Sequence, residues 1–144
     1  MEQEKPQLQK EHIVQSIILL WMFNRQPDTY DRQTEENIIK DLLMLMPKFV
    51  PFLDINEMSS SYLYLRKMGV ENTHTLMQEL LMKALHEVET SEQIIGLPAL
   101  SRLVVGINTG RDFFTPMLCA PFMRHLQQHI ENCSTEEDAR LIAI

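Results

Sequence analysis

The apolar residues of this chain recur every three to four positions over most of its length, which is the spacing of amphipathic helices. A first helix is predicted from His12 to about Asn24. A second is expected to begin with Thr34 as its N-cap, with apolar positions that run to Phe52. Pro47 and Pro51 are expected to kink or end this helix. Strand-like alternation of useful length does not occur, so the pattern favours an all-α chain.

Residues typical of helix starts and helix ends also occur in the middle of the chain. Asp54 or Asn56 is expected to cap a third helix, which ends at Gly69 because glycine adopts the left-handed conformation that follows many helices. A fourth helix is then expected to begin at Asn72 or Thr73. Together these signals predict a pair of helices joined by a short connection.

The same signals predict three more helices toward the C-terminus. Ser91 is expected to cap a fifth helix, which ends around 108–110, and Asp112 is expected to cap a sixth. Ser134, with Glu137 three positions later, has the pattern of a capping box and predicts the start of a seventh.

The expected caps recur at a nearly constant interval, which is typical of helical-repeat proteins. We therefore predict a right-handed stack of antiparallel helix pairs, an α-solenoid of about six to seven helices with a period near 38–40 residues. An irregular helical bundle is the alternative. In domain terms, residues 1–11 are expected to form an N-terminal tail and residues 12–144 a single helical-repeat domain from a longer protein. The caps that carry this prediction are Asp54, Ser91 and Ser134 for one type of helix and Thr34, Asn72 and Asp112 for the other.

The net charge, the cysteines and the length of the apolar runs limit the functions that the chain can have. The net charge of −7 gives no overall attraction for a phosphate backbone, so any nucleic-acid role needs a local basic patch. Cys119 and Cys133 lack a disulfide or CxxC pattern and are expected to be reduced thiols of an intracellular protein. No apolar run reaches the roughly 20 residues that span a bilayer, so membrane insertion is not expected.

Catalytic motifs are missing from the sequence. It contains no GxGxxG, P-loop, GxSxG or HExxH pattern. His125 and His129 lie four positions apart and would share one helical face, but two ligands do not make a metal site. We therefore predict a non-enzymatic chain without a cofactor or a metal.

A few residues could instead form a binding surface. Arg66 and Arg102 lie in predicted helices of the same type, one repeat apart, and could face one groove. Lys67 and Tyr62 lie next to Arg66 and could add a positive charge and a stacking ring. Solenoids bind extended ligands in this way, with one or two side chains from each repeat, so these four residues are the predicted RNA- or partner-binding site.

Several stretches resemble the repeats of the FAST kinase domain-containing proteins, which are related to octotricopeptide repeats. They are Ser60–Gly69 followed by Leu80–Leu85, and, in the next unit, Leu100–Ile107 with Phe122–Leu126. The resemblance covers about residues 12–144. It consists of degenerate leucine positions, and no kinase motif accompanies them.

This resemblance implies a mitochondrial protein that regulates RNA processing, stability or translation, with an α-solenoid in front of a C-terminal RAP domain. Neither a RAP domain nor a mitochondrial presequence occurs here, so the resemblance also implies missing neighbouring repeats. The acidic charge is a departure that argues against direct RNA binding by this segment. The alternative is a HEAT- or armadillo-like scaffold that binds a protein, through a methionine-rich surface for example.

Overall fold

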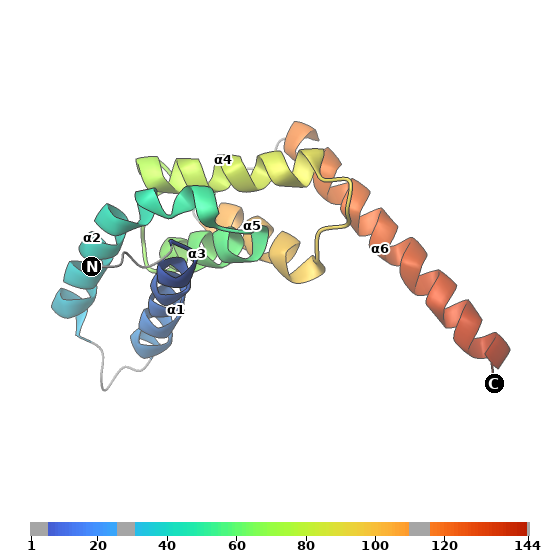
Figure 1. Cartoon of the computed structure of the whole chain (residues 1–144), viewed down its shortest axis with the longest axis horizontal. Coiled ribbons are helices and arrows are strands. Elements are labelled where there is room, and N and C mark those ends of the chain that lie inside the picture. The colour runs from blue at the N-terminus through green and yellow to red at the C-terminus, as the bar shows by residue number, and fades with distance from the viewer. Residues whose placement is uncertain (1–5, 26–30, 110–115, 144) are drawn as a thin grey trace.

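The computed structural model describes residues 6–25, 31–109 and 116–143, and over these ranges the chain is all-α, as predicted, with no strand. Two short 3-10 turns, η1 and η2, follow the second helix (Figure 1). The elements are α1 (Pro6–Asn24), α2 (Arg32–Leu45), η1 (Met46–Lys48), η2 (Val50–Phe52), α3 (Ile55–Lys67), α4 (Thr75–Thr90), α5 (Leu97–Thr109) and α6 (Pro116–Ala143).

The boundaries around α3 agree with the predictions. Asp54 forms a complete capping box: its carboxylate accepts from the Glu57 N–H at 2.8 Å, and its own N–H donates to the Glu57 carboxylate at 2.9 Å. Gly69 ends the helix with a φ of 97°, which a residue with a Cβ rarely adopts. α2 ends at Leu45, seven residues before the expected Phe52; Pro47 follows in η1 and ends the α-helix, as expected, whereas Pro51 lies in the separate turn η2.

The first two helices begin earlier than expected. α1 begins at Pro6 and not at His12, so part of the expected tail is helical; proline suits the first turn, where no partner for its missing N–H is needed. The N-cap of α2 is Asp31 and not Thr34. Both the backbone N–H and the hydroxyl of Thr34 donate to the Asp31 carboxylate, at 3.2 and 2.7 Å.

The expected caps of α4 were also wrong. The N-cap is His74, whose Nδ1 accepts from the Leu76 N–H at 3.2 Å, and neither Asn72 nor Thr73 takes this role. Asn72 instead accepts a hydrogen bond from the buried Tyr62 hydroxyl at 2.6 Å. A tertiary contact thus uses the side chain that local sequence assigned to the cap.

Ser91 does not open the fifth helix. It is the C-cap of α4, and α5 begins six residues later, at Leu97. The physical reason is Pro98, because a helix that began at Ser91 would carry this proline in its interior, where the ring displaces a carbonyl and removes a hydrogen bond. In the observed helix Pro98 lies in the first turn, where it is tolerated.

Ser134 does not open a seventh helix either. α6 runs without interruption from Pro116 to Ala143, because no glycine or proline after Pro121 stops it. The other expected cap in this region, Asp112, lies outside the described residues. The observed helix starts are therefore spaced differently from the predicted 38–40 residues: α3 and α5 begin 42 positions apart, and α2, α4 and α6 begin 43 and 41 positions apart.

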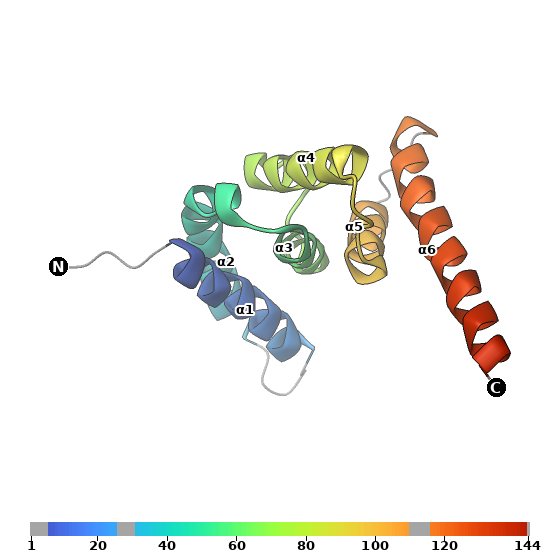
Figure 2. The same ribbon diagram turned by 45° about the vertical axis from the view of Figure 1, so that its right-hand side comes forward.

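Three helices lie in a row and run in the same sense. α3 is the middle member, with α1 on one side and α5 on the other (Figure 2). Near their N-terminal ends, Lys10 of α1 donates to the Glu57 carboxylate at 2.8 Å, and nearer their C-terminal ends the rings of Trp21 and Tyr64 are 6.2 Å apart. α4 packs against α3 and α6. We call α1, α3 and α5 the parallel row.

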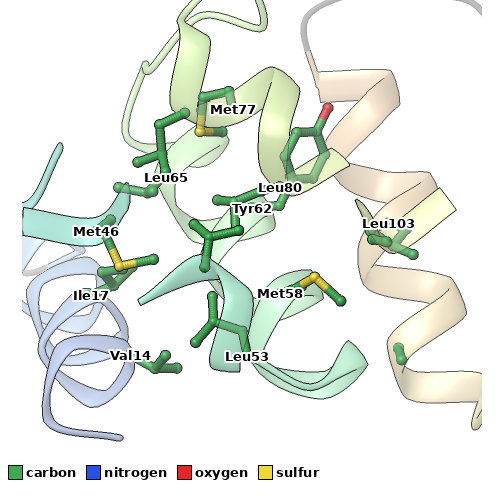
Figure 3. Packing of buried hydrophobic residues seen from close by; sticks show 14 of the residues in the cluster. Val14, Ile17, Met46, Leu53, Met58, Tyr62, Leu65, Met77, Leu80 and Leu103 are labelled. Carbon is green, nitrogen blue, oxygen red and sulfur yellow. The ribbon is translucent and has the colours of Figure 1, made fainter. Parts of the chain in front are cut away.

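The hydrophobic core surrounds α3, which packs against α1 and α5 of the parallel row and against α4 (Figure 3). Tyr62 is completely buried among Met77, Leu80 and Leu103. Its ring also lies against Gly106 of α5, where a Cβ would come within 2.7 Å of the tyrosine Cε2. α3 and α5 therefore approach so closely at this point that only glycine fits.

We predict that Gly106→Ala destabilises the protein by about 1–3 kcal/mol in urea unfolding, because the added methyl group overpacks the Tyr62 ring. Alanine is the better helix former by about 1 kcal/mol, so a loss cannot come from helix propensity. Asn108→Ala, at an exposed position of the same helix, is the control and should change stability by less than about 0.5 kcal/mol. Unchanged stability of Gly106→Ala would show that the α3–α5 approach is not this tight.

Candidate partner-binding groove

An apolar groove lies between α5 and α6, on the side of α5 that faces away from α3. It encloses about 250 Å³. Several side chains in and around it are unusually exposed for their type, with 43% exposure for Leu97, 46% for Val105 and 58% for Ile130. Among the residues that the structure describes, none that lines it is charged; they are Leu97, Leu100, Ser101, Val104, Val105, Phe122 and Leu126.

The α5 wall of this groove repeats the surface through which α3 binds α5. Ser59 of α3 accepts a 3.4 Å hydrogen bond from Arg102, and Tyr62 and Leu63 lie against Gly106. Because α3 and α5 begin 42 positions apart, each of these α3 residues has an equivalent in α5. The equivalents are Ser101, Val104 and Val105, and all three line the groove. α5 therefore presents outward the helical positions that in α3 already hold a parallel helix.

The α6 wall is positioned by the end of α4. The last carbonyl groups of a helix have no partner within the helix, and α4 has no basic residue in its last turn. Arg124 of α6 supplies the donors, with bonds of 3.0 Å to the Val88 carbonyl and 3.1 Å to that of Glu89. A cation at the C-terminal end of a helix is also favoured by the helix dipole.

Two histidines of α6 complete this attachment. His125 is completely buried; its Nδ1 accepts from the Ile95 N–H at 3.2 Å, and its Nε2 donates to the Val88 carbonyl at 2.7 Å. One turn later, the Nε2 of His129 donates to the Ile95 carbonyl at 2.7 Å. The pair considered from sequence as metal ligands thus binds backbone. The described part of the chain holds no cluster of three or more histidine, cysteine or acidic residues suited to a metal ion.

The two predicted arginines do come together, but inside the protein. Arg66 is only 5% exposed and donates to the carbonyls of Gly106 and Val70, both at 3.2 Å. Arg102, half-buried, donates in the opposite direction, from α5 to Ser59 of α3. The two arginines were expected to face one groove, but their side chains join α3 and α5 to each other.

The other two predicted residues lie apart. Tyr62 is buried in the core, so its ring has no face to offer a ligand. Lys67 is exposed, and its ammonium lies 5.2 Å from the centre of the Trp21 ring, which Arg25 also approaches at 5.8 Å. Such cation–π contacts contribute about 0.5–1 kcal/mol at exposed sites.

The groove itself was not predicted, although α5 carries a signal for it. A helix that buries one face has an apolar stripe of about three positions in seven. α5 exceeds this, since Val104 and Val105 follow Leu103 directly and widen the stripe beyond one face. A helix this apolar needs contacts on two sides, and α3 supplies only one.

Comparison with known proteins gives no relative. No protein-family model, curated protein or solved structure matches the chain. As to membranes, none of the helices within the described ranges combines the length and the apolar character needed to cross one.

We predict that Arg66→Ala lowers the free energy of unfolding by about 1–3 kcal/mol, because it removes the guanidinium that donates to the buried carbonyl groups of Gly106 and Val70. Arg32→Ala removes an arginine whose side chain is 80% exposed, and should change stability by less than about 0.5 kcal/mol. Urea unfolding of both variants tests this. Equal, small effects would mean that Arg66 is not a structural residue.

For His125→Ala we expect a similar loss, about 1–3 kcal/mol, since the buried Ile95 N–H loses its acceptor and the Val88 carbonyl loses one of its donors, the other being Arg124. A specific readout is hydrogen exchange of the Ile95 amide, which should become faster than in wild type. His86→Ala, at an exposed position of α4, is the control. If the Ile95 amide exchanges equally slowly in all three proteins, His125 does not hold α6 in place.

Proposed function

We propose that this chain is a non-catalytic helical interaction module of the α-solenoid type, which binds an α-helix of a protein partner in the groove between α5 and α6. The observation that carries the proposal is the match between the groove and the α3–α5 interface. A helix laid on α5 would meet the same helical positions that α5 meets on α3.

The energetics favour such a ligand. Full burial of a leucine, valine or phenylalanine side chain contributes roughly 1.5–3 kcal/mol, so covering Leu97, Val105 and Leu126 is a substantial driving force. The described lining residues of the groove carry no charge that would have to be desolvated. An apolar helix in a hydrophobic groove is also a common mode of peptide recognition.

The observations support a protein partner better than RNA. Of the four residues expected to bind RNA or a partner, Arg66 and Tyr62 are buried, and Arg102 donates to Ser59. Lys67 is the exposed member, and the net charge is −7. The mitochondrial location and the membership in the FAST kinase domain-containing family stay predictions, as does the right-handed sense of the stack.

We predict that a fluorescent, hydrocarbon-stapled peptide of residues 97–109 binds the chain saturably in an anisotropy titration. The staple joins positions 101 and 105, which leaves free the side chains with which α5 binds α3, such as Ala99 and Leu103. Val105→Asp in the chain should weaken binding by at least about tenfold, because it buries a carboxylate against apolar side chains. Met82→Asp, at an exposed position of α4, should not.

A parallel titration with single-stranded RNA at low salt separates the two functions. Salt-sensitive RNA binding that Lys67→Ala weakens and Val105→Asp leaves unchanged would favour RNA and contradict the proposal. Peptide binding that is the same in Val105→Asp and in wild type would also contradict it.

A further inference from the structure

The parallel row has a second uncovered end, at α1. Leu19, Met22 and Phe23 are 53%, 58% and 55% exposed, and their spacing places them on one helical face. This face points away from α3, against which Ile17 and Trp21 of the same helix pack. Phe23 also lines a smaller hollow between α1 and α2, together with Ile38.

The two exposed ends of the parallel row, the outer face of α1 and the outer face of α5, could join in the same order and sense as the helices within the row. Within the row, each helix contacts the next in the same sense, from α1 to α3 and from α3 to α5. A second copy placed beyond α5 would continue this order with its own α1, which would lie on α5 as α5 lies on α3. The contact would therefore extend an interface that already exists within the chain.

The two ends are also compatible in charge. Nine consecutive residues of α1, Ser16–Asn24, include no acidic or basic side chain, and neither do the groove-lining residues within the described ranges. Two copies of net charge −7 repel each other elsewhere, but these surfaces can meet without burying a charge.

We propose that the helix which the groove takes is α1 of a second copy of this chain, so that copies associate head to tail. This inference rests on the function proposed above and names the partner of the same groove. The contact is heterologous, because it joins two different surfaces of the molecule, and such contacts produce rings or open chains in place of closed pairs.

The test is the mass of the full chain by light scattering after size-exclusion chromatography, from about 10 µM to about 1 mM, the range of weak association. Wild type should gain mass as the concentration rises. Val105→Asp, which blocks the groove, and Met22→Asp, which blocks the α1 end, should each stay monomeric. Both positions are exposed, so the variants should keep the helical circular dichroism of wild type, and Met82→Asp, the control, should associate like wild type.

Mixing the two blocked variants gives the decisive result. The α1 end of Val105→Asp is intact, and so is the groove of Met22→Asp, so an equimolar mixture should form a dimer and nothing larger. Raising the salt concentration should preserve or strengthen this dimer, because the screened force is repulsion between acidic copies.

Three outcomes would overturn the inference: wild type that stays monomeric throughout, a mixture that stays monomeric, or Met22→Asp that associates like wild type. If the stapled peptide still requires an intact Val105 in any of these cases, the groove binds helices from another protein and the proposed function stands. If Val105→Asp affects neither the peptide nor the mass, the groove is not a binding site and both proposals fail.

Discussion

The close contact between α3 and α5 at Gly106 is the constraint on which the rest of the structure depends. Because Gly106 has no side chain, the Tyr62 ring can lie directly against the α5 backbone, and Arg66 can reach the Gly106 carbonyl. The hydroxyl of the same tyrosine binds Asn72 in the connection to α4. Tyr62 of α3 thus contacts both α5 and the connection that leads into α4. A larger residue at position 106 would therefore displace α5 from α3 and disturb this tyrosine.

This contact also determines which face of α5 remains free. Arg66 and Arg102, which sequence alone would place on the surface, bridge α3 and α5. Arg66 of α3 donates to a carbonyl of α5, and Arg102 of α5 donates to a hydroxyl of α3. A buried arginine is tolerable only when its donors are paired, and the carbonyl of a closely approaching helix provides a partner. With the polar groups used internally, the outward surface of α5 is left apolar. The apolar groove is therefore a consequence of the hydrogen bonds that pair the polar side chains between α3 and α5.

The sequence predicted the helices well where the signal was local, and less well where a distant contact decided. Asp54 and Gly69 act within one helical turn, and both were placed correctly. Asn72 failed as a cap because Tyr62, ten positions earlier, uses its side chain. Ser91 and Ser134 failed for a different reason, since serine is common at caps: Pro98 decides where α5 can begin, and no glycine or proline between Pro121 and Ser134 ends α6. The exposure of Arg66 depends on a helix 40 residues away, so no local pattern could reveal that it is buried.

The two walls of the groove are held by different forces, and this bears on how the groove can respond to a ligand. α5 is fixed by tight packing against α3, with Tyr62 lying on Gly106. α6 is attached through Arg124, His125 and His129 to backbone groups between Val88 and Ile95, by directional hydrogen bonds at one end of a long helix. Phe122 of the same helix adds an apolar contact, because its side chain is buried in the hydrophobic core. A helix bound in the groove would therefore lie between a wall held by packing, α5, and a wall held mainly by hydrogen bonds, α6, so the two walls respond to different substitutions.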